Sequence, residues 1–135
     1  MLCQIEDWRI FIKDGEQYLN TALAADKKKS TVFTPEILYN ITAMAIEKYL
    51  MGFLMYNNDL ADNHTMADLL DSIKRHVTPS PSMIEDLLYI DSFQDICDTF
   101  NATYKIPRPE EMQRILSIGQ KVRDFTISKV TPLAA

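Results

Sequence analysis

The sequence contains few of the residues on which common nucleotide-binding loops depend. Only three glycines occur in 135 residues, and they stand far apart at positions 15, 52 and 119. Glycine-rich phosphate loops of the P-loop or Rossmann type need two or three glycines within one turn. Both kinds of loop are therefore excluded.

Cysteine and histidine are equally scarce, with two of each. Cys3 and Cys97 have neither CxxC spacing nor zinc-type partners, so we expect free thiols in a reducing compartment. His64 and His76 stand well apart in the sequence, and no HExxH or Glu-x-x-His motif accompanies them. We therefore expect no metal site, no cofactor and no cysteine nucleophile.

Long apolar runs are also missing. The longest uncharged apolar stretch extends from Tyr49 to Asn58, half of the roughly 20 residues that a membrane helix needs. The first residues do not combine a basic segment with an apolar core and a cleavage site. We expect no membrane association and place the chain in the cytoplasm.

The composition that is present, 47% hydrophobic and 24% charged, is typical of one soluble globular domain, here residues 1–135. The net charge is −5, from 14 basic and 19 acidic residues, so we expect no DNA binding. The charge is uneven, because residues 105–135 carry 6 basic and 3 acidic side chains. Either this C-terminal segment binds an anion, or it packs beside the acidic residues around 85–98 and neutralises them, which is the favoured interpretation.

Apolar residues recur at helical spacing in almost every segment, which predicts an all-α protein. The expected helices are about 8–25, 35–56, 66–77, 83–100 and 109–130, with a bend at residues 91 and 92 of the fourth. Thr34 with Pro35, Thr65 with Asp68, and Ser82 with Glu85 are the predicted helix starts.

These patterns predict an antiparallel up-and-down bundle of four long helices and one shorter helix. The second helix has so few polar interruptions that we expect it at the centre of the bundle. Gly119 has no side chain and is expected to mark a close contact between helices.

Three segments carry a recognisable pattern. Residues 45–54, AIEKYLMGFL, resemble the motif A-x-E-K-x-L-K-A-L-L, and residues 64–70, HTMADLL, resemble H-x-L-x-x-L-L with Met66 at the first leucine. Residues 100–107 resemble an aromatic loop that ends in Arg-Tyr-Pro. In this order the three segments resemble the central helix, the start of the next helix and the following loop of HEPN domains. The resemblance covers roughly residues 7–130 and implies a HEPN-like bundle.

This sequence departs from the catalytic members of that family. They carry an Arg-x(4–6)-His motif, whereas here no arginine precedes a histidine by five to seven positions, Arg75 and His76 are adjacent, and Lys105-Ile106 replace the Arg-Tyr pair. The resemblance therefore implies a non-catalytic bundle, a homodimer that binds a nucleotide or a small nucleotidyltransferase-like protein.

Carried over position by position, the resemblance implies a ligand groove whose candidate residues are Glu47, Lys48, His64, Tyr104, Lys105 and Arg108. Simpler roles stay open for several of them. Glu47 and Lys48 would form an ion pair between helices, His64 would bond to backbone at a helix start, and Tyr104 would cover the core from a loop.

Two other functions remain as alternatives. The first is a divergent HEPN ribonuclease or toxin–antitoxin component, in which His64 or His76 acts together with Arg108. The second is a structural adaptor that oligomerises through the methionine-rich second helix, residues 44–55.

Overall fold

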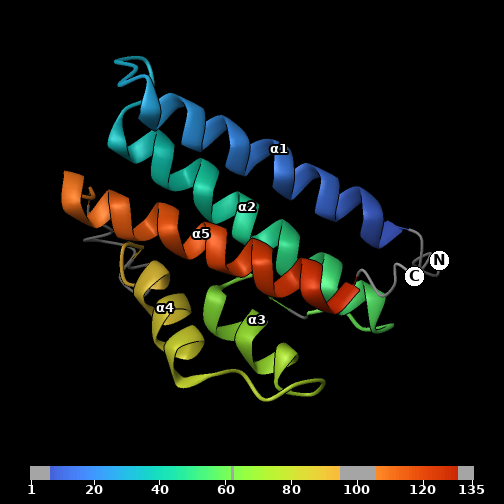
Figure 1. Cartoon of the computed structure of the whole chain (residues 1–135). Coiled ribbons are helices and arrows are strands. Elements are labelled where there is room, and N and C mark those ends of the chain that lie inside the picture. Colours follow the sequence, from blue (N-terminus) through green and yellow to red (C-terminus); the bar gives the residue numbers. More distant parts are fainter. Residues whose placement is uncertain (1–6, 62, 95–105, 131–135) are drawn as a thin grey trace.

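The structure is a computed structural model that describes residues 7–61, 63–94 and 106–130. These residues form five helices and no strand, as the periodicity predicts (Figure 1). The helices are α1 (Asp7–Lys27), α2 (Pro35–Tyr56), α3 (Met66–Ile73), α4 (Pro81–Asp91) and α5 (Pro109–Val130).

Two of the three predicted helix starts are confirmed. The Thr34 hydroxyl accepts a hydrogen bond from the backbone N–H of Ile37, and Thr65 does the same for Asp68 at 3.1 Å. The third prediction is wrong, because α4 begins after Ser80 rather than at Ser82, and Ser80 Oγ accepts from Met83 N. Pro81 follows Ser80 at the first helical position, where its fixed φ suits the helix, so the serine before this proline is the cap.

The helix lengths differ from those expected. Three helices are long and two are short among the described residues, since α3 has 8 residues and α4 has 11. The fourth helix ends at Asp91 instead of only bending there, because the Ser92 hydroxyl bonds to the Tyr89 carbonyl and the Asp91 side chain turns to α3. Its expected continuation beyond residue 94 lies outside the described residues.

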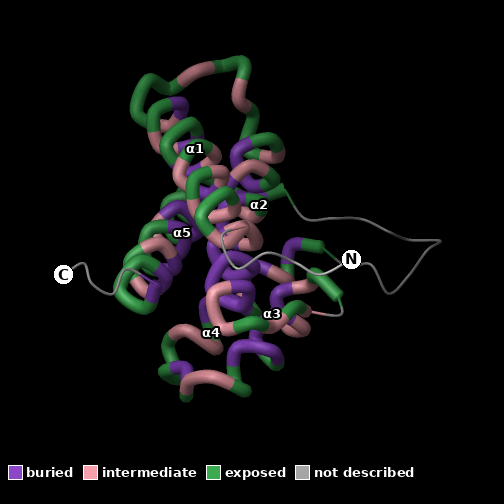
Figure 2. Tube along the Cα trace, turned by 90° about the vertical axis from the view of Figure 1, so that its right-hand side faces the viewer, coloured by how far each residue is buried: buried purple, intermediate pink, exposed green. Residues whose placement is uncertain are grey.

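The three long helices lie side by side, and α3 and α4 cover the side of α2 and α5 that faces away from α1 (Figures 1 and 2). The second helix is central, as predicted, because it packs on α1, α5 and α3. It buries residues on nearly every side, including Leu38, Ala45, Leu50 and Met55. Figure 2 shows buried residues concentrated along α2 and on the inner side of α5.

Each of the three glycines marks a close approach between long helices. A Cβ on Gly119 of α5 would lie 2.9 Å from Leu19 Cδ1 and 3.2 Å from Thr42 Cγ2, so the predicted close contact is confirmed. A Cβ on Gly52 of α2 would lie 2.7 Å from Ile12 Cδ1, and one on Gly15 of α1 would lie 3.2 Å from the Tyr49 ring. These distances leave little or no room for a methyl group.

The basic fifth helix packs against acidic α4, as the favoured interpretation held. Arg114 and Lys121 of α5 each place a nitrogen 3.7 Å from a carboxylate oxygen of the buried Asp86. Burying a carboxylate is costly unless it is paired, and two cations meet that need here. The positive charges of Arg114 and Lys121 therefore neutralise a carboxylate of α4 within the fold. Asp95 and Asp98 lie outside the described residues.

Candidate functional site

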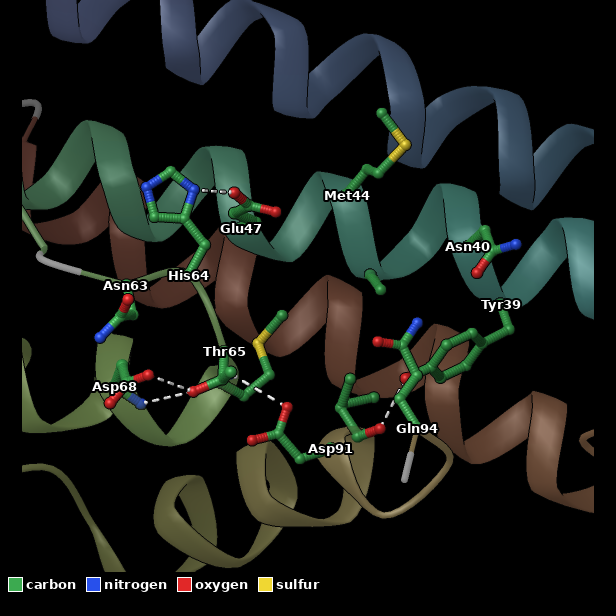
Figure 3. Close-up of a pocket in the computed structure, with 13 residues that line it drawn as sticks. Tyr39, Asn40, Met44, Glu47, Asn63, His64, Thr65, Asp68, Asp91 and Gln94 are labelled. Atoms are coloured by element: carbon green, nitrogen blue, oxygen red, sulfur yellow. Dashed lines mark hydrogen bonds and ion pairs between the residues drawn. The ribbon is translucent and has the colours of Figure 1, made fainter. Parts of the chain in front are cut away.

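A groove of about 880 Å³ lies between α2 and the facing ends of α3 and α4, and we call it the α2–α3–α4 groove (Figure 3). Its walls come from three separate parts of the chain. The lining residues are Tyr39, Asn40, Ala43, Met44 and Glu47 of α2, Asn63, His64, Thr65, Met66 and Asp68 at the start of α3, and Ile90, Asp91 and Gln94 at the end of α4.

The α2 wall follows from helix geometry, because positions 39, 43 and 47 recur every four residues and share one face. Tyr39 fixes this wall to α4, since its hydroxyl donates a 2.6 Å hydrogen bond to the Ile90 carbonyl and its ring packs 5.5 Å from that of Phe93. Burial, and next the negative charge of Asp91, raise the pKa of the Tyr39 phenol well above its usual range. Tyr39 is therefore a neutral, fixed part of the wall.

The α3 and α4 walls are joined by one carboxylate. Asp91 Oδ1 accepts from Met66 N at 3.0 Å, and Oδ2 accepts from Ala67 N at 2.9 Å. These are among the first N–H groups of α3, which have no partner within the helix. Thr65 Oγ1 adds a 2.7 Å hydrogen bond to the Asp68 carboxylate (Figure 3). The start of α3 is thus held by residues on both sides of the groove.

Glu47 and His64 close one end of the groove. The Nδ1 atom of His64 lies 2.6 Å from Glu47 Oε2, and because a carboxylate only accepts, Nδ1 donates (Figure 3). The His64 side chain is 54% exposed and that of Glu47 is 31% exposed. The contact joins α2 to the segment before α3, so His64 bonds to a side chain rather than to the backbone partner proposed from its position.

The structure brings Glu47 and His64 together but places the other described candidates elsewhere. Lys48 stands 4.8 Å from the centroid of the Phe11 ring on α1, because adjacent helix positions point about 100° apart. Of the ion pair between helices left open for these two residues, the structure shows a contact of Glu47 with His64, while Lys48 stands over Phe11.

Arg108 precedes α5 and does not line the groove. Its guanidinium lies 3.3 Å from Glu111 and 3.5 Å from Glu110, and the hydrogen bond with Glu111 raises the pKa of Arg108. Tyr104 and Lys105 lie outside the described residues, as do both cysteines.

The second histidine belongs to a cluster just after the C-terminal end of α3. Asp59 Oδ2 accepts from His76 Nε2 at 2.7 Å and from Arg75 Nε at 3.0 Å. Burial alone would raise the pKa of Asp59, but the hydrogen bonds from His76 and Arg75 outweigh it and lower the pKa. Each histidine thus pairs with a carboxylate, and among the described residues neither contacts Arg108.

Sequence reasoning missed the groove residues that are not part of the family motif, among them Tyr39, Asn40, Asp91 and Gln94. The sequence indicated Asp91 only as part of a bend and of the acidic stretch around residues 85–98, and not as a residue of the groove. Its role depends on a contact with residues 24 and 25 positions earlier, and local spacing carries no signal of such a contact.

Among residues 7–61, 63–94 and 106–130, no group of three or more His, Cys, Asp or Glu side chains is placed to hold a metal ion. Within the same ranges, every helix is too short or too polar to cross a bilayer. The groove is acidic, with three carboxylates from Glu47, Asp68 and Asp91 and with no lysine or arginine among its lining residues.

No family model matches the chain, and no curated protein matches it either. Among solved structures, the chain is similar to the protein TT1696 from Thermus thermophilus. The two sequences are 18% identical, the match covers 91% of this chain and 98% of that chain, and the TM-score is 0.69. At this identity the likeness shows a shared fold and nothing about function.

Proposed function

We propose that this chain is a non-catalytic binding module, an antiparallel HEPN-like bundle that holds a partner protein in the α2–α3–α4 groove. The single observation that carries the proposal is the groove itself, which combines apolar residues such as Met44 and Ile90 with three carboxylates. Apolar grooves with a few polar side chains are a recurring way for a domain to bind a segment of a partner. In line with the HEPN resemblance, the partner is a small nucleotidyltransferase-like protein, and the module is a cytoplasmic homodimer.

A protein partner is favoured over a nucleotide because of the charge in the groove. Nucleotide phosphates are anionic and are usually met by Lys, Arg or free backbone N–H groups. The groove offers none of these cations, and the α3 N–H groups that face it already bond to Asp91. We therefore expect that any binding of millimolar ATP or AMP does not depend on Glu47 or His64.

The pairing of the histidines supports a non-catalytic role. Phosphodiester cleavage by an Arg/His pair needs the arginine beside the histidine, where it stabilises the anionic phosphorane. Arg108 instead lies against Glu110 and Glu111, and His64 faces Glu47. Arg75 does lie beside His76, but both donate to Asp59 Oδ2, so this carboxylate takes the place that a phosphate would need. RNA incubated with the purified chain should stay intact. Cleavage that His64→Ala or His76→Ala abolishes would replace this proposal with the ribonuclease alternative.

The partner is tested by co-expression with a small nucleotidyltransferase-like protein encoded beside this chain. Met44→Glu places a charge at the groove, where the wild-type side chain is 41% exposed, and should weaken the complex at least tenfold. Leu88→Glu is the matched control, because Leu88 is 46% exposed on α4 and does not line the groove. A complex that survives Met44→Glu, or the lack of any complex, contradicts the proposal.

A further inference from the structure

The groove has one sign of charge and an apolar floor. Glu47 stands on α2, Asp68 on α3 and Asp91 on α4, so each of three walls carries one carboxylate. Among the lining residues His64 is the only side chain able to carry a positive charge, and its Nδ1 already faces Glu47. An occupant that brings its own cation would complement this field.

The carboxylates differ in how much of their hydrogen-bonding capacity the fold uses. Both oxygens of Asp91 accept from the first N–H groups of α3, and Asp68 Oδ2 accepts from the Thr65 hydroxyl. Glu47 Oε2 accepts from His64, whereas Oε1 has no hydrogen bond among the described residues and points along the groove toward Met44 (Figure 3). Glu47 is thus the carboxylate best placed to receive a ligand.

Apolar side chains continue beside Glu47 on the same helix. Ile37 and Met44, seven positions apart and therefore on one face, are each 41% exposed, with the half-buried Ile41 between them. Ala43 and Met66 extend the apolar surface into the groove. A strip of apolar residues next to a carboxylate is complementary to a segment with apolar side chains and a nearby Lys or Arg.

We propose that the α2–α3–α4 groove is specific for a basic amphipathic segment of a partner protein, with a Lys or Arg side chain seated on Glu47 and apolar side chains on Met44 and, beyond the groove on the same face of α2, on Ile37. The inference rests on the proposed function and names the chemistry of the partner. A lysine or arginine next to Glu47 replaces water with a charge-assisted hydrogen bond, and its aliphatic part covers the apolar floor.

The test uses a display library of random 12-residue peptides selected on the immobilised full chain. Peptides that bind the wild-type chain but not the Met44→Glu chain should be enriched at least threefold in Lys and Arg, accompanied by Leu, Ile, Phe or Met. Their binding should weaken at least fivefold with Glu47→Gln and also fall with added salt, which screens charge. Glu47→Gln keeps an acceptor for His64 Nδ1, so the contact that closes the groove remains.

The matched control is Glu85→Gln, which removes the same charge from an exposed position of α4 outside the groove. Binding of the selected peptides should not change with this variant. Peptides without basic residues, or peptides that bind wild-type and Glu47→Gln chains equally, overturn the inference. If the nucleotidyltransferase-like partner is lost from Met44→Glu but not from Glu47→Gln, the proposed function stands and the inference alone fails. A partner that stays on Met44→Glu removes both.

Discussion

The three long helices and the two short ones are held together by different means. Between α1, α2 and α5 the contacts are mainly apolar and close, with Gly15, Gly52 and Gly119 at the approaches, and side-chain hydrogen bonds such as that from Tyr49 to Glu16 are few. The short helices α3 and α4 also bury apolar residues such as Leu69 and Leu87, but specific side-chain hydrogen bonds fix the positions of these two helices. These bonds join Tyr39 to Ile90, Asp91 to the start of α3, Glu47 to His64, and Asp59 to Arg75 and His76.

The comparison teaches where the site's geometry comes from. Helices of 8 and 11 residues are too short to be stable alone in water, so α3 and α4 depend on their surroundings. Apolar packing tolerates small shifts, whereas a hydrogen bond fixes which atoms meet. The long helices thus supply most of the stability, and the polar contacts set the shape of the groove.

The largest expected effect is at the centre of the long-helix layer. In Gly52→Val, the added carbons meet Ile12 Cδ1 and the Trp8 carbonyl oxygen, where even a Cβ would lie at 2.7 and 3.2 Å. We expect the free energy of unfolding to fall by about 3 kcal/mol and the whole chain to unfold earlier in a thermal melt. Asn20→Val on the exposed side of α1 is the control for β-branching. Equal melting temperatures for the two variants would mean that α1 and α2 do not depend on close contact.

The next effect should stay local to the short helices. Asp91→Ala leaves the N–H groups of Met66 and Ala67 without their acceptor, which should cost about 2 kcal/mol. Hydrogen exchange should accelerate in α3 and change little in α1. Asp71→Ala is the control, since Asp71 is exposed and its ion pair with Lys74 is long, at 4.0 Å. Uniform acceleration along the chain would contradict the division into two regions.

A pH-dependent effect should arise at Asp59, which ties the residues after α2 to those after α3. Its pKa is lowered in the folded chain, so its contribution is fully present above the ordinary carboxyl value of 3.8 and is lost as the pH falls from there through the lower pKa of the folded chain. The difference between denaturant melts of wild type and Asp59→Asn should therefore be largest near pH 7 and shrink as the pH is lowered below 3.8. A difference that does not shrink below this pH would exclude this role for the carboxylate.

The smallest effect is expected at Thr126 of α5. Its hydroxyl is buried and has no hydrogen-bond partner among the described residues. Thr126→Val keeps the shape and removes the desolvation penalty, so stability should rise by about 1 kcal/mol. The measurement is the midpoint of a urea melt, with Ser128→Ala as a control on the exposed side. A lower midpoint for Thr126→Val would point to a polar contact at this hydroxyl.

Much of the fold was predictable because its signals are local. The spacing of apolar residues predicted the five helices. Thr34 and Thr65 indicated two helix starts, because each side chain accepts a hydrogen bond from the backbone N–H three residues later. Ser80 was missed because Ser82 with Glu85 satisfies the same local pattern. The early end of α4 was missed because Asp91 leaves the helix pattern for a contact on α3.

The site was predictable only in part. Glu47 and His64 came from the family resemblance, and the structure adds that they touch. Neither the resemblance nor the local sequence pattern indicated Tyr39 and Asp91 as groove residues, since each contributes through a residue far along the chain. Whether the HEPN resemblance extends to function remains a prediction for the partner experiment.

Asp91 belongs to two parts of the molecule at once, because the carboxylate that lines the groove is also the acceptor that completes the start of α3. A cation that drew Asp91 toward itself would release two backbone amides and loosen the first turn of that helix. Binding of a cationic ligand in the groove would then lower the helical order of the first turn of α3. The backbone amide signals of Met66 and Ala67 would therefore report occupancy of the groove without a label on the ligand.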